Sequence, residues 1–223
     1  MKKLSFILCL TVFTVAAMAQ NTATTFGVKA GVSHAGFRGD AAGNLNDILE
    51  FSDGMITTNN RTGLFAGVSA NIPLGGAISV EPGLYYTERG YELQGELGLK
   101  GIEFLGVNAK AQLQQQYIDI PLLLNADLGG GLQLFAGPQV SYLMKSNLKT
   151  TAGLFGVNLL NKTMDATDQF NRWDMAVTGG VGFQLKNGLN LSAAYDYGLS
   201  KVDANKNVNG YNTAFKVGIG FRF

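Results

Sequence analysis

Few side chains in this sequence are of the types that carry catalysis. His34 is the only histidine, and it directly follows Ser33. A serine becomes a nucleophile when a base accepts its proton within hydrogen-bond distance. Neighbouring residues of an extended strand point to opposite faces, so Ser33 and His34 cannot form that pair together. We therefore predict no catalytic residue, while an enzyme in which His34 serves another serine remains the alternative.

Two short patterns in residues 38–50 resemble binding motifs. Arg38, Gly39 and Asp40 form a tripeptide that adhesion receptors bind, although three residues recur often by chance. The acidic and amide residues that follow miss the spacing of an EF-hand calcium loop. The sequence also lacks phosphate-loop, zinc-site and nucleotide-binding fingerprints. We predict no metal and no cofactor.

A set of charged residues recurs on one side of alternating segments, among Gly, Ser, Thr and Asn. If these segments close around a lumen, the charges face each other and must pair, because buried charges need partners. The simpler interpretation is that these charges form a structural salt-bridge network, and the alternative is that they form a path for protons or solutes. The predicted lumen charge network consists of Lys29, Glu81, Asp119, Asp174, Asp196, Lys216 and Arg222.

The last twelve residues indicate which elements position these charges. Thr213, Phe215, Val217, Ile219, Phe221 and Phe223 form one alternating row, and residues on the other row are small, polar or charged. Period-2 alternation over this length is typical of a β-strand with different surroundings on its two faces. Eight such segments can be counted along the chain: 26–37, 62–72, 77–92, 114–127, 131–145, 171–186, 189–200 and 212–223.

The connections between these segments alternate in length. Short glycine-containing turns follow segments two, four and six, and Asn187-Gly188 is a strong hairpin signal. The other four connections are long, at residues 38–61, 93–113, 146–170 and 201–211. This pattern predicts an all-β fold, an eight-stranded antiparallel up-and-down transmembrane β-barrel with four long external loops and three short periplasmic turns.

Alternation alone does not decide whether the apolar row faces lipid or the core of a soluble lipocalin-like barrel. Aromatic residues close the apolar row at both ends, as expected at the two interfaces of a membrane. The predicted aromatic belts contain Phe26, Tyr86, Tyr142, Trp173, Phe183, Tyr197, Phe215, Phe221 and Phe223. Eight strands leave an interior that side chains can fill. We therefore expect a polar plug and no aqueous channel.

The start of the chain predicts export. Lys2 and Lys3 precede an apolar run that ends in Ala17-Met18-Ala19, as in a secretory signal peptide. We expect a signal peptide over residues 1–19, Sec export with cleavage after Ala19, and a barrel domain over residues 20–223. The single cysteine, Cys9, leaves with the signal. A formal net charge of +1 makes nucleic acid an unsuitable partner.

Several segments together resemble the PorT-like outer-membrane barrel family, the "outer membrane protein beta-barrel domain" proteins. The resemblance covers essentially the whole mature chain and is most specific at Tyr117-Ile118-Asp119-Ile120-Pro121-Leu122, with further matches at residues 26–31, 81–86 and 136–143. It implies an eight-stranded barrel in the outer membrane of a Gram-negative-type bacterium. It also implies that the barrel-assembly machinery reads Phe221 and the terminal Phe223.

The resemblance implies little about the role of the protein. We predict a non-enzymatic integral outer-membrane protein, structural or binding an envelope or surface protein or ligand through its external loops, and surrounded by outer-membrane lipid. The alternatives are a lipid-modifying enzyme of the outer membrane and a subunit of a secretion or transport assembly. Apolar residues in 93–113 and 146–170 suit either local hairpin packing or a partner surface.

Overall fold

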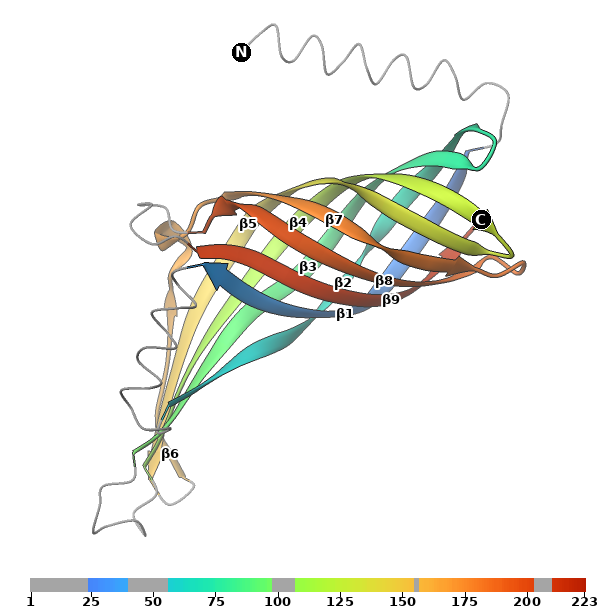
Figure 1. The fold of residues 1–223 in the computed structure, drawn as a ribbon. Helices are drawn as coiled ribbons and strands as arrows, with labels where there is room; N and C mark the ends of the chain where they lie inside the picture. Colours follow the sequence, from blue (N-terminus) through green and yellow to red (C-terminus); the bar gives the residue numbers. More distant parts are fainter. Residues whose placement is uncertain (1–23, 40–55, 98–106, 155–156, 203–209) are drawn as a thin grey trace, which may run out of the picture.

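Within residues 24–39, 56–97, 107–154, 157–202 and 210–223, which a computed structural model describes, the chain forms nine β-strands and a 3-10 helix (Figure 1). The helix is Thr167–Gln169. The strands are β1 (Thr25–Gly39), β2 (Ile56–Gly75), β3 (Ile78–Leu97), β4 (Val107–Gly129), β5 (Leu132–Leu154), β6 (Val157–Asp165), β7 (Trp173–Gln184), β8 (Leu189–Lys201) and β9 (Gly210–Arg222).

Eight of these strands close into a barrel. Each pairs antiparallel with its neighbours in the order β1-β2-β3-β4-β5-β7-β8-β9, and β9 returns to β1. Beside the closing pair, the backbones of Phe26 and Phe223 exchange hydrogen bonds of 2.9 and 2.8 Å. A closed wall leaves no sheet edge unpaired, which is the condition for strands to cross a bilayer. The predicted eight-stranded antiparallel barrel is confirmed.

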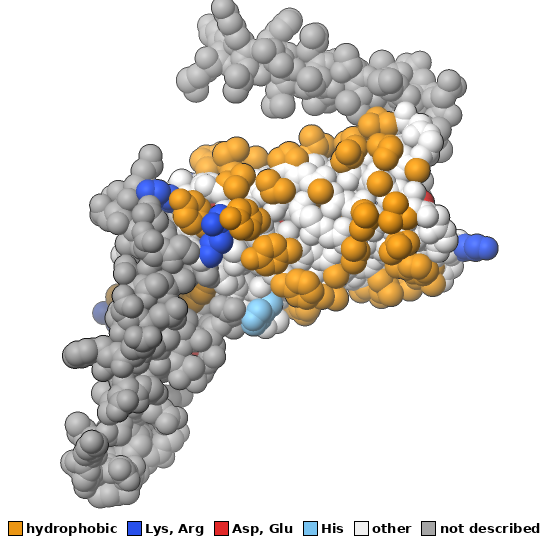
Figure 2. Space-filling view, viewed as in Figure 1, with side chains coloured by type: hydrophobic (Ala, Val, Ile, Leu, Met, Phe, Trp, Pro, Cys, Tyr) orange, Lys and Arg blue, Asp and Glu red, His pale blue; other side chains and the backbone are white. Residues whose placement is uncertain are grey.

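Side chains alternate between the outside and the inside of the wall. In β9, Phe215 and Ile219 are about half exposed on the outside, whereas Ala214 and Lys216 are buried on the inside. The same alternation in β7 exposes Met175, Val177 and Val181. Hydrophobic side chains therefore cover the outer wall (Figure 2). The lumen receives the polar and charged residues.

Tight turns join the strands at one rim of the barrel. The β2–β3 turn contains Gly75 and Gly76 with φ of +119° and +58°, and Gly188 in the β7–β8 turn has φ of +92°. Glycine adopts these positive angles without a steric penalty. The Asn187 side chain also accepts a hydrogen bond from the Leu189 backbone N–H at 3.1 Å. We call this end of the barrel the turn rim; β1 begins there and β9 ends there (Figure 1).

At the opposite rim, strands β2 to β6 continue beyond the barrel (Figure 1). The inner part of β5 pairs with β7, from Leu132↔Phe183 to Tyr142↔Trp173, and its outer part pairs with β6. We call this projecting sheet the outer extension, and it comprises residues 56–60, 91–97, 107–116, 145–154 and 157–165. Residues 56–60, 93–97, 107–113, 146–154 and 157–165, predicted as parts of loops, therefore lie in paired strands.

Two sequence predictions concern parts of the chain that the strands do not cover. The predicted signal peptide, residues 1–19, lies outside the described residues. So do residues 40–55, which contain the acidic and amide pattern after Arg38. Among the residues described, no helix is long and apolar enough to cross a membrane.

Candidate functional site

The centre of the lumen holds a cluster of five ionised side chains, which we call the central cluster. Arg89 of β3 lies 2.7 Å from Asp119 of β4, 3.5 Å from Asp174 of β7 and 3.8 Å from Asp196 of β8. Lys216 of β9 completes it, with its Nζ 3.0 Å from Asp119 and 2.6 Å from Asp196. Five strands thus contribute one charge each, which ties the barrel wall together across its interior.

Neutral polar groups surround the carboxylates of the central cluster. Thr87 donates to Asp119 at 2.7 Å, Thr178 donates to Asp196 at 2.8 Å, and Asn212 donates to Asp174 at 2.7 Å. The Tyr117 ring lies 4.6 Å from the Arg89 guanidinium. Buried carboxylates that accept several hydrogen bonds and face cations stay charged without water. The cluster is therefore built to persist in a dry interior.

A second, smaller cluster lies toward the turn rim, and we call it the turn-rim cluster. Glu81 pairs with Arg222 at 2.9 Å and with Lys29 at 3.9 Å. It also accepts hydrogen bonds of 3.0 Å from both Ser69 and Asn125. The turn-rim cluster has two cations and one carboxylate, which gives a net charge of +1. The central cluster has two cations and three carboxylates, which gives a net charge of −1, so the two clusters together are neutral.

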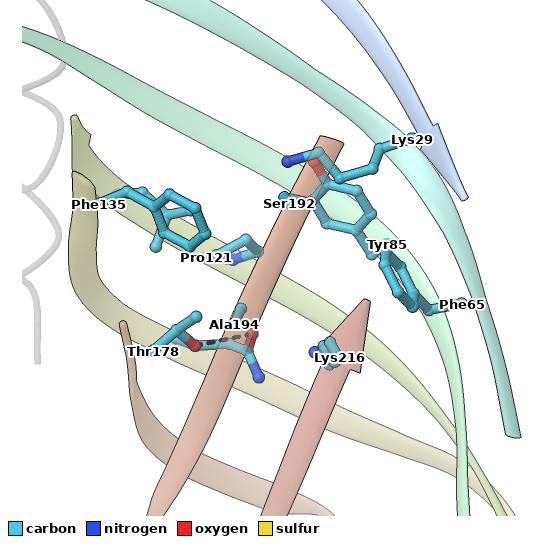
Figure 3. Close-up of a pocket in the computed structure, with 11 residues that line it drawn as sticks. Lys29, Phe65, Tyr85, Pro121, Phe135, Thr178, Ser192, Ala194 and Lys216 are labelled. Carbon is cyan, nitrogen blue, oxygen red and sulfur yellow. Dashed lines mark hydrogen bonds between the residues drawn. The ribbon is translucent and has the colours of Figure 1, made fainter. Parts of the chain in front are cut away.

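A layer of apolar side chains separates the two clusters. Phe65, Tyr85 and Phe135 enter the lumen from β2, β3 and β5 (Figure 3). The Phe65 and Tyr85 rings meet edge to face at 6.2 Å between centroids. The Lys29 ammonium lies 5.9 Å from the Phe135 ring and the Lys216 ammonium 5.9 Å from the Phe65 ring. The space left between these groups has a volume of about 50 Å³. That is room for very few waters, so the layer blocks the lumen.

All seven residues of the predicted lumen network lie in these two clusters, and the structure adds Arg89. Arg89 shares the odd-numbered row of β3 with Glu81, Tyr85 and Thr87, all of which are buried. Because residues of one strand with the same parity face the same side, this pattern could have predicted that Arg89 faces inward. The contacts themselves could not be predicted, because they depend on the register between strands that are far apart in sequence.

The residues of the predicted aromatic belts lie on the outer wall. Tyr142 and Trp173 are cross-strand partners whose rings meet edge to face at 5.0 Å between centroids. Phe223 is two-thirds exposed, and Tyr86 is half-buried with its hydroxyl donating to Glu88 at 3.2 Å. The other predicted members are exposed: Phe26, Phe183, Tyr197, Phe215 and Phe221. Their position at the two membrane interfaces stays a prediction.

The structure separates Ser33 from His34. Ser33 is buried on the lumen side, and His34 is exposed on the outer wall, where its Nδ1 lies 3.2 Å from the Thr62 hydroxyl. A catalytic triad would also need a carboxylate that orients the histidine. Within the described part of the chain, His34 has no hydrogen bond or ion pair with a carboxylate. The geometry offers a hydroxyl beside a base, without the third group.

Among the described residues, the side chains that could bind a metal ion do not form a site. In the described ranges, no three side chains of His, Cys, Asp or Glu come together in a way that could hold a metal ion. The three carboxylates of the central cluster are occupied by Arg89 and Lys216.

The outer extension reverses the polarity of the barrel wall. Tyr91, Leu113, Leu148 and Met164 are successive cross-strand partners, so they form one row across β3, β4, β5 and β6. This row faces the lumen side, because the Tyr91 hydroxyl donates to Asn212 at 3.2 Å. The adjacent row on the other face is polar and consists of Glu92, Gln112, Lys149 and Thr163.

This reversal marks where the wall leaves the hydrocarbon. Below the rim, Ile118 and Ile120 of β4 point outward; above it, Gln112, Gln114 and Gln116 do. An outward row of amides and charges suits water and not lipid. The outer extension is thus a water-facing sheet with an apolar inner face.

At the end of β6, the Thr167 hydroxyl and backbone N–H donate to Asp165, and these hydrogen bonds lower the pKa of that carboxyl.

Comparison with known proteins gives a family match. A family model described as "Outer membrane protein beta-barrel domain" matches residues 18–204. Comparison with curated proteins found no match.

Three solved structures of bacterial outer-membrane proteins are similar to this chain. The crystal structure of Ail, the attachment invasion locus protein of Yersinia pestis, is 13% identical, with 89% of this chain and 98% of that chain covered and a TM-score of 0.46. Neisserial surface protein A is 14% identical, with 90% and 99% covered and a TM-score of 0.45. OprG from Pseudomonas aeruginosa is 15% identical, with 90% and 96% covered and a TM-score of 0.44.

Proposed function

Because this chain belongs to the outer membrane protein beta-barrel domain family and therefore lies in the outer membrane, we propose that it is a non-enzymatic anchor that holds the outer extension at the cell surface for a protein partner. The observation that carries this proposal is the reversed polarity of the outer extension. A wall that only had to cross the membrane would not need paired strands beyond the rim. An extended sheet edge or face above the membrane is a common way to bind another protein.

The filled lumen supports the same function. Within the described residues, two ionic clusters and an aromatic layer lie across the lumen, and the space left in that layer is about 50 Å³. Such a network stabilises a barrel by linking distant strands, and it performs no transport. In this proposal the charges of the lumen serve the fold, and the specific activity resides outside the barrel.

The route to the membrane belongs to the same proposal. A signal peptide over residues 1–19 with cleavage after Ala19 would deliver the chain through the Sec pathway, and the barrel-assembly machinery would read Phe221 and Phe223 at the end of β9. The segment from Tyr117 to Leu122 supports assignment to the PorT-like group within the family. A mass measurement of the mature protein beginning at Gln20 would establish the cleavage site.

Photo-crosslinking in intact cells tests the partner surface directly. A photoreactive residue would replace Leu148 on the inner face of the outer extension, Lys149 on its outer face, or Val177 on the lipid-facing wall of the barrel as a control. We expect one protein adduct, of the same mass in repeated experiments, from Leu148 or Lys149 and none from Val177. A partner recovered in fixed stoichiometry would identify a subunit of an assembly. Absence of any adduct from both extension positions would contradict the proposal.

The hydrogen bond between His34 and Thr62 favours a second candidate, an enzyme acting on membrane lipid. Both side chains lie on the outer wall, where a lipid can reach them. Replacing His34 with alanine would abolish such an activity, because the hydroxyl would lose its base. We expect the lipid composition of cells carrying His34→Ala to match that of wild type. A changed acylation or headgroup pattern would replace the anchor proposal with the enzymatic one.

A further inference from the structure

An arginine on the outer wall is held between two aromatic rings. The Arg38 guanidinium lies 3.8 Å from the centroid of the Tyr197 ring and 4.7 Å from that of Tyr211. One of its amino groups donates to the Gly198 carbonyl at 2.5 Å. Its Nε is buried and has no hydrogen-bond partner in the described part of the chain. Stacking of this kind fixes the plane and the direction of a guanidinium.

A second cation lies in the same cross-strand row. Arg38 pairs with Tyr211 in the register between β1 and β9, and Tyr211 pairs with Lys201 in the register between β8 and β9. Residues directly opposite each other in neighbouring strands project from the same face. Arg38 and Lys201 therefore project from the outer wall on either side of Tyr211, roughly two strand spacings apart or about 10 Å.

This pair of cations lies at the edge of the lipid-facing surface. Leu199 precedes Lys201 by two residues in β8, Phe215 follows Tyr211 by four residues in β9, and both are about half exposed. Strand β1 ends at Gly39 and strand β8 ends at Lys201, both at the rim opposite the turn rim. Figure 2 shows Lys and Arg side chains, in blue, beside hydrophobic side chains at this end of the wall. Lipid headgroups, with their phosphates, meet a membrane protein at this depth.

Among the described residues, the two cations differ from those of the lumen. Lys29, Arg89, Lys216 and Arg222 of the lumen all pair with carboxylates, whereas neither Arg38 nor Lys201 forms an ion pair with a carboxylate in the described ranges. A guanidinium whose plane is fixed by two aromatic rings is suited to the tetrahedral oxygens of a phosphate, and a neighbouring ammonium adds charge.

We propose that Arg38 and Lys201, framed by Tyr197 and Tyr211, bind the phosphate group of a lipid headgroup in the outer leaflet. The lipid chains would then lie along the apolar wall formed by Leu199 and Phe215. This inference rests on the outer-membrane location of the barrel and is independent of the partner proposed for the outer extension.

The test uses the refolded full-length mature protein in bicelles of phosphatidylcholine containing phosphatidic acid. Native mass spectrometry measures which lipid the protein retains. The variants are Arg38→Gln, Lys201→Gln and the double variant, with Lys186→Gln as control, because Lys186 is an exposed lysine at the turn rim. Wild type and K186Q should retain phosphatidic acid in preference to phosphatidylcholine. The double variant should lose about tenfold of that preference, as expected for removal of charge-assisted hydrogen bonds.

Two further measurements, of folding and of inorganic phosphate binding, complete the test. The heat-dependent gel shift of each variant reports whether the barrel is folded, and K201Q alone carries the test if replacement of Arg38 prevents folding. Binding of inorganic phosphate without any preference between the two lipids would overturn the lipid assignment and leave a free-anion site. Equal retention of phosphatidic acid by wild type and K201Q or the double variant would overturn the proposal altogether.

Discussion

Arg89 is the residue on which the central cluster depends. It faces three carboxylates inside the wall, and Lys216 alone cannot neutralise them. Breaking a buried ion pair by removing one partner costs roughly 3–5 kcal/mol, because the remaining charge stays buried. We therefore expect Arg89→Ala to lower the free energy of unfolding by about that amount, measured by urea titration of the barrel in detergent micelles.

The matched control for this measurement is Lys186→Ala. Lys186 is exposed at the turn rim, and such substitutions usually change the free energy of unfolding by less than about 0.5 kcal/mol. If R89A and K186A shifted the urea midpoint equally, the central cluster would not be a structural element.

At the residue scale, parity in the sequence predicted the direction of seven inward-facing charges but not that of Arg89. Lys29, Asp119 and Lys216 alternate with apolar neighbours, and this pattern predicted their direction. The choice of partners was not available from the sequence. Asp119 and Lys216 are 97 positions apart and meet only because β4 and β9 lie across the same lumen. Arg89 was overlooked, because its neighbours Glu88 and Gly90 interrupt the apolar row.

At the scale of the strands, glycine decides how closely the barrel wall can pack. A Cβ added to Gly137 of β5 would lie 2.0 Å from the Leu122 carbonyl oxygen and 3.0 Å from the Leu123 Cα, both of the neighbouring strand β4. Backbone atoms in a paired strand cannot move aside. We expect Gly137→Ala to lower the free energy of unfolding by about 1–3 kcal/mol, as overpacking does elsewhere.

A neighbouring glycine provides the control for that prediction. Gly179 of β7 pairs with Ala136 of β5, and a Cβ added to it would meet only the Phe135 carbonyl oxygen at 3.9 Å. Gly179→Ala should therefore change the unfolding midpoint little. Equal effects of G137A and G179A would mean that general strand propensity, and not the close approach of β4 and β5, determines the result.

Most of the outer extension could not be predicted from hydrophobic alternation. The strand prediction rests on apolar residues in one alternating row, so it ends within a few residues of the end of that row. In β4 the outward row changes from Ile118 and Ile120 to Gln112, Gln114 and Gln116. A shift in register between β4 and β5 lies next to this change, at Gln116/Tyr117. The backbone continues as strand because hydrogen bonds to the next strand do not require lipid on one face.

For the whole molecule, the filled lumen predicts that the barrel does not conduct ions. The aromatic layer of Phe65, Tyr85 and Phe135 leaves about 50 Å³ between two ionic clusters, which is room for very few waters. Purified protein in a planar lipid bilayer should give no discrete conductance steps. A porin recorded in the same bilayer serves as the positive control. Reproducible steps from the folded protein would contradict the blocked lumen and reopen a transport function.

The central claim is that the apolar row of each strand faces hydrocarbon while the charged row faces the lumen. Cysteine scanning can test it, because Cys9 is the only cysteine and lies in the predicted signal peptide. Spin labels would be placed singly at Met175, Val177 and Val181 of β7, with Lys186 at the turn rim as the water-exposed control. The most direct measurement is the relaxation of each label by oxygen, which dissolves in lipid, and by a water-soluble nickel complex. The three β7 labels should respond to oxygen and be shielded from nickel, whereas the label at Lys186 should respond to nickel; nickel access to the β7 labels equal to that at Lys186 would contradict the account.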